Sequence, residues 1–376
     1  MKWEKVKLGN VTDSCLGKML DQNKNKGDYQ PYLANVNVRW GEFDLEDLPL
    51  MKFEESEQER YELKYGDLVI CEGGEPGRCA IWKEQIPNMK IQKALHRVRV
   101  HDCLDYRYLF YWFLLAGKTG ELDQYFTGAT IKHMPGQKLK EVVIDKPPLE
   151  IQHRIADILS AYDDLIENNQ KQIKLLKEAA QRLYKEWFVD LRFPGHENTK
   201  IVDGVPEGWR RGLLKELISV NYGKDHKKVP DDGNIPVYGS GGLMRKCNKS
   251  LFSGEAVLIP RKGSLNNIMY VDETFWTVDT MFYATMKQPH TAVFVYFFVK
   301  AFDMYSMNIG AAVPSMTTKI LDAMDVVIPD KETLEKFDKY AKVYFNKIKT
   351  LQGQNEQLKT ARDLLLPKLM SGEVEV

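Results

Sequence analysis

Residues 149–188 read LEIQHRIADILSAYDDLIENNQKQIKLLKEAAQRLYKEWF, a stretch without proline or glycine near the middle of a 376-residue chain. Its apolar residues recur at alternating steps of four and three, which is the heptad spacing of a coiled-coil helix. At about 1.5 Å per residue, a helix over 151–187 is roughly 54 Å long, which is more than the width of a small domain. The predicted seam consists of Ile151, Ile155, Ile158, Tyr162, Leu165, Asn169, Gln172 with Ile173, Leu176, Ala180, Leu183 and Trp187.

A second stretch of the same kind covers residues 334–372, which read LEKFDKYAKVYFNKIKTLQGQNEQLKTARDLLLPKLMSG. Pro147 and Pro148 precede the first helix, whereas Asp330 is the expected N-cap of the second and Ser371-Gly372 its expected end. The second seam consists of Leu334, Phe337, Ala341, Tyr344, Ile348, Leu351, Asn355, Leu358, Leu365 and Leu369, with Arg362 as the one break.

The simplest interpretation is that the two seams face each other in an antiparallel pair. Asn169 and Asn355 interrupt the seams near their middles, where a buried polar side chain can fix the register of a coiled coil. An apolar stripe is also the pattern of any core-facing helix, so ordinary packing stays an alternative. The residues predicted to pair are Ile155, Tyr162, Asn169, Leu176, Leu183, Tyr344, Leu351, Asn355 and Leu358.

Composition and length are those of a folded protein with room for two domains of ordinary size. No apolar run approaches the about 20 residues that cross a bilayer, and the first ten residues lack the apolar region of a signal peptide. We therefore expect a cytoplasmic protein without membrane contact. Its five cysteines never form CxxC, so reduced structural thiols are predicted in place of disulfides or a zinc site.

The formal net charge is zero, which argues against a stand-alone nucleic-acid binder, but the positive charge is concentrated locally. Residues 221–262 hold eight Lys and Arg against four Asp and Glu, a net charge of +4. Residues 76–107 hold seven against three, again +4. Each half of the chain therefore has one basic segment, although a mixed solvated surface explains such counts equally well.

The two halves of the chain resemble each other in order. WEKVKL from 3 corresponds to WRRGLL from 209, and YGDLVICEGGEPG from 65 to SGEAVLIPRKGSL from 253. GATIKHM from 128 corresponds to GAAVPSM from 310, and a long predicted helix follows in each half. This is a repeat of two units, in which loop insertions shift the spacing.

The predicted fold class is α+β: two similar mixed α/β domains joined by two long antiparallel coiled-coil helices, with pseudo-twofold symmetry. DYRYLFYWFLLAG from 105 and TAVFVYFFVKAF from 291 are expected to be buried helices. Two readers on a long spacer suit a repeating ligand such as duplex DNA, whose major groove returns to one face about every 34 Å. The predicted boundaries are 1–148 and 193–330 for the domains, with 149–192 and 331–376 for the helices.

Catalytic motifs are missing from the sequence. AGKT at 116–119 looks like the end of a phosphate-binding loop, but that motif requires glycine at position 112, where the chain has Trp112. There is no GxGxxG after a strand and no HExxH, and the seven histidines lack metal-ligand spacing. The sequence therefore predicts a chain that binds and positions other molecules, with no catalytic residue, cofactor or metal of its own.

Several stretches resemble the specificity subunits of Type I restriction-modification systems, and the resemblance covers nearly the whole chain. Residues 147–195 followed by VPEGWR resemble the central conserved region of that family, and LKTARDLLLPKLMSGEVEV resembles its distal conserved region. IPVYGSGGL, LIPRKGSLNNIMYV and FWTVDTMF resemble features of its target recognition domains, as does ANVNVRWGEFDLEDL from 34.

The resemblance implies that each domain is a target recognition domain reading one half of a split, asymmetric sequence in double-stranded DNA, while the helices set the gap. It implies as partners two methyltransferase subunits, which bind S-adenosylmethionine and methylate adenine, and two ATP-driven restriction subunits that can join them. The chain itself would then be non-catalytic, with S-adenosylmethionine, ATP and Mg expected on its partners. Those partners would also explain the neutral charge, since they can supply phosphate contacts.

Sequence readout requires polar side chains on loops that face base edges, and grip on the backbone requires cations or small polar groups. Each candidate has an alternative as an ordinary turn or surface residue. In the first half the candidates are Asn35, Asn37, Arg39, Glu72, Glu75, Arg78, Thr130, Lys132 and His133. In the second half they are Lys227, Lys228, Tyr238, Ser240, Arg261, Lys262, Ser264 and Asn266.

The main alternative is a scaffold protein whose repeated domains bind other proteins and whose helices form a stalk. A nuclease or methyltransferase with an unfamiliar active site is a third interpretation, which has little support in the motifs. Only the specificity-subunit interpretation requires binding that depends on DNA sequence.

Overall fold

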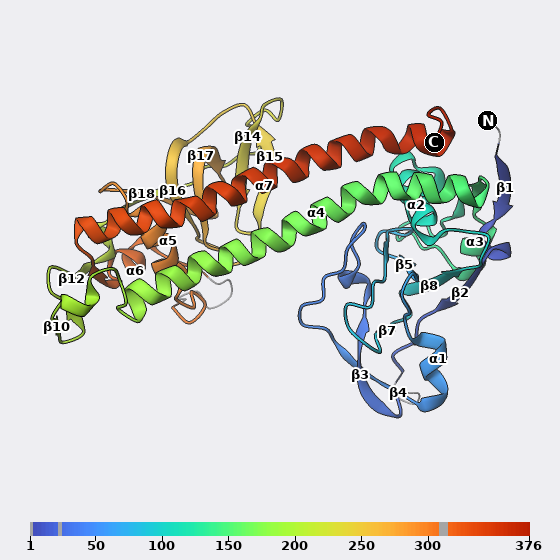
Figure 1. Ribbon diagram of the computed structural model, residues 1–376, viewed down its shortest axis with the longest axis horizontal. Helices are drawn as coiled ribbons and strands as arrows, with labels where there is room; N and C mark the ends of the chain where they lie inside the picture. Colours follow the sequence, from blue (N-terminus) through green and yellow to red (C-terminus); the bar gives the residue numbers. More distant parts are fainter. Residues whose placement is uncertain (1–2, 22–24, 308–314) are drawn as a thin grey trace. The chain divides into compact units, whose positions relative to one another are not determined.

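A computed structural model describes residues 3–21, 25–307 and 315–376 of the chain (Figure 1). The chain divides into two compact units: unit 1 comprises 1–168 and 354–376, and unit 2 comprises 169–353. Each unit contains part of both long helices, α4 (Leu149–Tyr184) and α7 (Lys331–Ser371), and a π-helical turn at Lys185–Val189 follows α4.

Unit 1 contains three small sheets. Their strand orders are β2-β8-β5-β6, β4-β3-β7 and β1-β9. The strands are β1 (Glu4–Lys7), β2 (Thr12–Leu16), β3 (Asp28–Leu33), β4 (Leu50–Phe53), β5 (Leu68–Cys71), β6 (Cys79–Ile81), β7 (Lys90–Ile91), β8 (Leu95–Val100) and β9 (Val143–Lys146). The short helices are α1 (Gln58–Tyr61), α2 (Tyr106–Thr119) and α3 (Gly136–Glu141).

Unit 2 is built around a larger sheet of order β13-β18-β16-β17-β14-β15, with the pairs β12-β19 and β10-β11 beside it. The strands are β10 (Ile201–Val202), β11 (Val205–Pro206), β12 (Arg210–Leu213), β13 (Ile218–Tyr222), β14 (Ile235–Gly239), β15 (Gly242–Cys247), β16 (Phe252–Pro260), β17 (Met269–Thr277), β18 (Met281–Met286) and β19 (Asp325–Ile328). The short helices are α5 (Ala292–Lys300) and α6 (Thr318–Asp322). As predicted, α2 and α5 are largely buried.

The two units share one topology, which confirms the predicted repeat. β2, β8 and β5 pair as β13, β18 and β16 do, and β3 pairs β7 in parallel as β14 pairs β17. Connecting hydrogen bonds recur as well, from the Gly17 amide to the Leu95 carbonyl and from the Gly223 amide to the Met281 carbonyl. Of the matched segment 310–316, residues 310–314 lie outside the described residues.

One part of the predicted correspondence was wrong by a single residue. The sequence match aligned Glu72 with Pro260, but Cys71 opposes Leu95 just as Pro260 opposes Met281. The structural counterpart of Glu72 is therefore Arg261. Unit 2 has one more residue than unit 1 between Gly254 and Gly263, the glycines that correspond to Gly66 and Gly74, and this extra residue hides the register in the sequence.

The ends of the long helices follow the predicted signals. The Asp330 carboxylate accepts a hydrogen bond from the Thr333 amide at 2.9 Å, so it caps α7 as expected. Gly372 follows the last helical residue with a positive φ of 71°, which confirms the predicted end. At the start of α4, the Gln152 amide group donates to the Pro147 carbonyl at 2.8 Å and anchors the first turn.

In each unit the local segments of α4 and α7 share one apolar core. In unit 1, Ile155 belongs to the same core as Leu369, and in unit 2 Trp187 packs against Phe337 with ring centroids 5.8 Å apart. Of the residues predicted to pair, Ile155, Asn169, Leu351 and Asn355 are buried. Tyr162, Leu176, Leu183, Tyr344 and Leu358 are partly buried.

Two members of the predicted α4 seam were wrong. Ile158 and Leu165 are 37% and 52% exposed, and their neighbours Leu159 and Ile166 are buried instead. The buried face is turned because α4 packs on α2 as well as on α7 within unit 1. The Tyr111 hydroxyl of α2 donates to the Asp163 carboxylate of α4 at 2.6 Å, which fixes that orientation.

Candidate nucleic-acid interface

Four loops of unit 2 are held together by hydrogen bonds at one part of the large sheet. The Lys224 amide donates to the Thr277 carbonyl at 2.9 Å, and the Arg261 amide donates to the Thr280 carbonyl at 2.8 Å. The Asn267 side chain donates to the Ser240 carbonyl at 2.8 Å. We call residues 223–229, 240–242, 261–267 and 278–280 the unit 2 rim.

The cations of the basic segment 221–262 have no carboxylate partner among the residues that the structure describes. Within residues 3–21, 25–307 and 315–376, none of its eight Lys and Arg side chains forms an ion pair. The Arg261 guanidinium lies over the Tyr222 ring at 5.5 Å, and its nearest hydrogen-bond acceptor is the Asp279 carbonyl at 3.4 Å. Lys227, Lys228 and Lys262 are exposed. The unit 2 rim is therefore a positively charged surface.

The neutral candidates of unit 2 differ in their exposure and in whether their polar groups already form hydrogen bonds. Ser264 is exposed and Ser240 is partly exposed. The Tyr238 hydroxyl donates to the Glu273 carboxylate at 2.5 Å, and burial raises the pKa of this tyrosine, so it stays neutral. The Asn266 side chain donates to the Asp303 carboxylate at 3.0 Å and accepts from the Met304 backbone amide at 2.8 Å. Its hydrogen-bonding groups are therefore already used within the unit.

The corresponding loops of unit 1 have the same backbone frame. The Lys18 amide donates to the Ile91 carbonyl at 2.9 Å, and the Glu72 amide donates to the Ala94 carbonyl at 2.9 Å. We call residues 17–18, 35–39, 72–78 and 92–94 the unit 1 rim. Lys18, the counterpart of Lys224, is only 3% exposed and forms an ion pair with Glu57.

Within the unit 1 rim, Arg78 joins two other candidates. Its guanidinium donates to the Glu75 carboxylate at 2.9 Å and to the Asn35 carbonyl at 3.2 Å. The Asn35 side chain in turn donates to the Gly73 carbonyl at 2.7 Å. A Cβ at Gly74, where φ is +74°, would lie 2.5 Å from the Asn35 amide nitrogen, so only glycine fits there. These side chains shape the loop and neutralise each other.

The other candidates of unit 1 divide into exposed and buried ones. Thr130, Lys132 and His133 are exposed in the loop before α3, and Arg39 is exposed in the separate loop 35–39. Asn37 was wrongly placed on an open loop, because it is buried and closes a 3-10 turn. Its side-chain oxygen accepts from the Ala34 amide at 2.9 Å, and its nitrogen donates to the Asp44 carbonyl at 3.1 Å.

The basic segment 76–107 of unit 1 is neutralised within the unit. Five of its seven cations form ion pairs: Arg78 with Glu75, Lys83 with Glu167, Lys90 with Glu62, Arg99 with Asp67 and Arg107 with Asp105. The hydrogen-bonded Asp67 carboxylate raises the pKa of Arg99 above its usual range. Most cations of this segment are therefore paired within unit 1, which is the mixed surface left open as the alternative, whereas those of the segment in unit 2 form no ion pair among the described residues.

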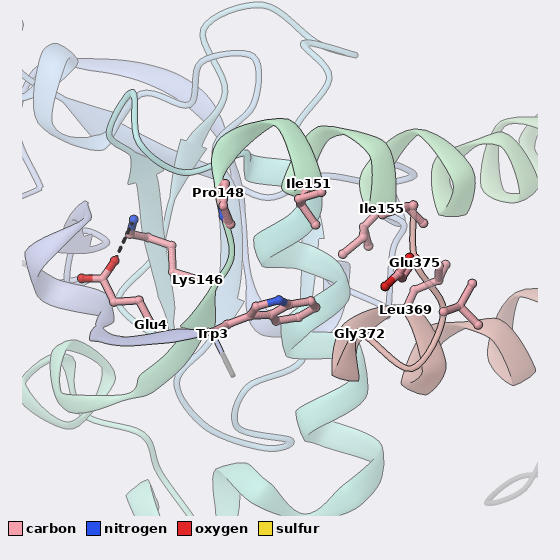
Figure 2. Close-up of a pocket in the computed structure, with 11 residues that line it drawn as sticks. Trp3, Glu4, Lys146, Pro148, Ile151, Ile155, Leu369, Gly372 and Glu375 are labelled. Carbon is pink, nitrogen blue, oxygen red and sulfur yellow. Dashed lines mark ion pairs between the residues drawn. The ribbon is translucent and has the colours of Figure 1, made fainter. Parts of the chain in front are cut away.

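An apolar pocket lies elsewhere in unit 1 (Figure 2). It is lined by Trp3, Ile151, Ile155, Leu369, Gly372 and residues 374–376, together with Glu4 and Lys146, which form an ion pair at 3.2 Å. In unit 2 the corresponding Trp209 is buried and packs against Phe193, with ring centroids 4.8 Å apart. The tryptophan that lines the pocket in unit 1 is therefore covered by an aromatic neighbour in unit 2.

Within residues 3–21, 25–307 and 315–376, no group of three or more His, Cys, Asp or Glu side chains is placed to hold a metal ion. Nor is any helix in them both long and apolar enough to span a membrane.

Comparison with known proteins identifies the family. The sequence profile described as Type I restriction modification DNA specificity domain matches residues 1–178 and 206–360, one match in each half of the chain. The chain belongs to this family. It is a specificity subunit of a Type I restriction-modification system, and its role is recognition of the DNA target. The scaffold alternative has no support in these findings.

Individual relatives agree with this assignment. The specificity subunit of Type I restriction enzyme MjaIX from Methanocaldococcus jannaschii is 27% identical over 352 residues, covering 83% of this chain and 78% of the relative. The MjaVIII subunit of the same organism is 24% identical over 414 residues, covering 100% and 93%. The crystal structure of a Type I S subunit from M. genitalium has the same fold, with a TM-score of 0.60, 19% identity and coverage of 98% and 96%.

Lys224 lies in the unit 2 rim but was not among the predicted DNA contacts of this specificity subunit. The sequence analysis included it only in the charge of segment 221–262. The signal that would have found it is the repeat, since Lys224 and Lys18 occupy one backbone position, and only Lys18 is buried with a carboxylate.

Proposed function

We propose that unit 1 and unit 2 each read one half of a bipartite, asymmetric DNA target through their rims. One observation carries this proposal: the same backbone frame occurs twice with different side chains. A frame built to one plan supports two similar docking geometries, and unlike side chains require unlike half-sites. In this proposal residues 1–148 and 193–330 are the two recognition domains, and the helices of 149–192 and 331–376 set the spacing between half-sites.

The proposed contacts divide by chemistry. Exposed lysines without an ion partner suit phosphate oxygens, which supply affinity without sequence information. Lys224, Lys227, Lys228 and Lys262 have this role in unit 2. In unit 1 the proposed phosphate contacts are Lys132 and Arg39, which are exposed although they lie 3.4 Å from the Asp123 carboxylate and 4.0 Å from the Asp44 carboxylate. Arg261 and Ser264 of unit 2, with Glu72, Thr130 and His133 of unit 1, are the proposed contacts to base edges. Asn35, Glu75, Arg78, Ser240, Tyr238 and Asn266 support the loops.

The proposed partners follow from family membership and from the charge of the chain. Two methyltransferase subunits carrying S-adenosylmethionine methylate adenine within the half-sites, and two restriction subunits use ATP and Mg. A neutral chain with one basic rim is a weak binder of DNA by itself, so the methyltransferases supply further phosphate contacts.

The decisive experiment is methylation mapping. The chain is expressed with its partner methyltransferase in a host that lacks adenine methylation, and methyladenine is located across the genome by single-molecule sequencing. The expected result is a split motif that appears only when both proteins are present. A soluble complex with an active methyltransferase but without a split motif would contradict the proposal. A control substitution, Lys319→Ala, removes a lysine of α6 outside the rim. This substitution should leave the motif unchanged.

A further inference from the structure

One position of the shared frame holds opposite charges in the two units. The Glu72 amide donates to the Ala94 carbonyl at 2.9 Å, and its carbonyl accepts from the Met134 amide at 2.7 Å. Arg261 makes the same two bonds, donating to Thr280 at 2.8 Å and accepting from Met316 at 2.9 Å. The backbone at this position is therefore fixed on both sides in each unit, and only the side chain differs.

The backbone after this position is also fixed in each unit. Gly73 is bridged to His133, and Lys262 is bridged to Ser315 in the same way. A Cβ at Gly73 would lie 2.8 Å from the His133 imidazole nitrogen, so the loop closely approaches its neighbour there. Both side chains consequently leave a rigid loop, which is what selective hydrogen bonding requires.

Neither side chain is neutralised by the protein. In the part of the chain that the structure describes, the Glu72 carboxylate has no hydrogen bond or ion pair, and the side chain is partly exposed. Glu75, three residues on, differs because it accepts hydrogen bonds from Trp40 and Arg78. The Arg261 guanidinium lies over the Tyr222 ring, which leaves most of its N–H groups free to donate.

We propose that position 72/261 reads a base in each half-site: Arg261 a guanine, and Glu72 a cytosine. A guanidinium donates two hydrogen bonds to guanine O6 and N7, whereas a carboxylate accepts from the cytosine amino group. An unpaired carboxylate at a DNA-binding loop repels phosphates, so it requires a donor such as this amino group. The inference rests on the proposed function, which it deepens by naming the bases.

The test is methylation mapping with Glu72→Ala and Arg261→Ala, each in the full subunit with its methyltransferase. Discrimination at one cytosine position of one half-site should fall roughly 5- to 150-fold in the first variant. Discrimination at one guanine position of the other half-site should fall similarly in the second. Every other position of the motif should stay as in wild type.

Matched controls separate local charge from base reading. Glu46→Ala removes an exposed carboxylate of unit 1 outside the rim, and Lys249→Ala removes an exposed cation of unit 2 outside the rim. Both should leave the motif intact. If Glu72→Ala or Arg261→Ala does not yield a folded complex, Glu72→Gln and Arg261→Gln remove the charge while keeping a polar side chain; the first is isosteric and the second is shorter than arginine.

Three outcomes would overturn the inference, and they differ in what they say of the proposed function. A split wild-type motif that both variants leave unchanged removes the base-reading role and keeps the proposed function. So does a uniform fall in methylation at every site, because that is the behaviour of a phosphate or structural contact. A wild-type complex with an active methyltransferase and no split motif removes both.

Discussion

The two rims have one backbone plan but place their charged side chains differently. Lys18 of unit 1 is buried beside Glu57, whereas its counterpart Lys224 of unit 2 is exposed and has no ion partner among the described residues. Glu72 of unit 1 stands where unit 2 has Arg261. A chain with zero net charge thus contains one rim in which Lys18 and Arg78 are paired with carboxylates, and one rim whose cations form no ion pair among the described residues.

The two units use their charged side chains in different places. In unit 1 they form part of the core: Lys90 is 0% exposed and pairs with Glu62 at 2.6 Å. The strand pairing places Trp276 of unit 2 at the position of Lys90, so unit 2 fills that place with an apolar ring. Charged groups support the fold of unit 1, whereas those of the unit 2 rim remain available to a ligand.

The largest expected effect comes from breaking the Lys90 pair. Glu62→Ala leaves the Lys90 ammonium buried without its carboxylate, and only the Asn88 carbonyl at 3.0 Å remains as an acceptor. We expect a loss of roughly 3 to 5 kcal/mol in the free energy of unfolding of unit 1, measured by urea denaturation. The double variant Glu62→Leu with Lys90→Met removes both charges and should recover most of it. Equal losses in the single and double variants would contradict this account.

The next effect concerns the unit 2 rim. Changing Lys224, Lys227 and Lys262 to Ala should lower affinity of the methyltransferase complex for target DNA on the order of 100-fold at 0.1 M salt. The slope of log affinity against log salt should become shallower by about 3, since about one counterion is released per phosphate contact. Fluorescence anisotropy over a salt series measures both quantities.

In the control variant, Lys200, Lys215 and Lys319 are changed to Ala. These substitutions remove the same amount of charge from unit 2 at positions outside the rim. An equal change of slope in the control would mean that the rim has no special part in binding. Lys18→Ala tests the other side of the comparison: it should destabilise unit 1 and leave the salt slope as it was.

A smaller effect is expected where the long helices differ. Arg362 of α7 and Ala180 of α4 lie at the same distance from the start of their helices. The Arg362 guanidinium pairs with Asp163, which also accepts from Tyr111 at 2.6 Å. Arg362→Ala should therefore lower the free energy of unfolding by about 2 kcal/mol, measured by thermal unfolding. The loss is limited because the Tyr111 hydroxyl still donates to the Asp163 carboxylate. Lys359→Ala, which loses only an exposed pair at 3.8 Å, should cost less than about 0.5 kcal/mol.

These contrasts also show what the sequence could reveal. The two long helices, the Asp330 cap and the repeat were predictable because heptad spacing, capping residues and ordered similarity are local signals. The exposed Ile158 was not predictable, because the packing of α2 turns the helix. Nor were the ion pairs of unit 1: Lys83 and Glu167 are 84 positions apart, and charge counts within a segment cannot include such a partner.

The candidate site was predicted in part for the same reason. Gly-bearing polar loops after apolar runs located the two rims, and Arg261 and Glu72 were both among the candidates. Their equivalence was hidden by the one extra residue before Gly263, since it becomes visible only in the strand pairing. Asn37 and Asn266 have the composition of DNA contacts, but their hydrogen bonds are used within the fold.

The smallest expected effect is a pH dependence confined to unit 1. His96 of β8 is buried where unit 2 has Phe282, and its imidazole donates to the Met134 carbonyl at 2.9 Å. Burial lowers the pKa of His96, although that carbonyl and the Glu72 carboxylate oppose the shift. The unfolded chain therefore takes up a proton first as the pH falls. Stability is complete above the unfolded pKa of about 6.5 and declines as the pH falls below it.

Hydrogen exchange of unit 1 and unit 2 amides between pH 7.5 and 5.5, corrected for intrinsic rates, measures this difference. Protection of β8 and its neighbours β2 and β5 should decrease relative to β18, β13 and β16, which surround Phe282. His96→Phe copies the residue of unit 2, so it should abolish the difference, and His101→Phe is the control because His101 is exposed. If wild type and His96→Phe lost protection alike, the acid sensitivity would arise from other groups. His96 would then contribute to unit 1 only by packing, as Phe282 does in unit 2.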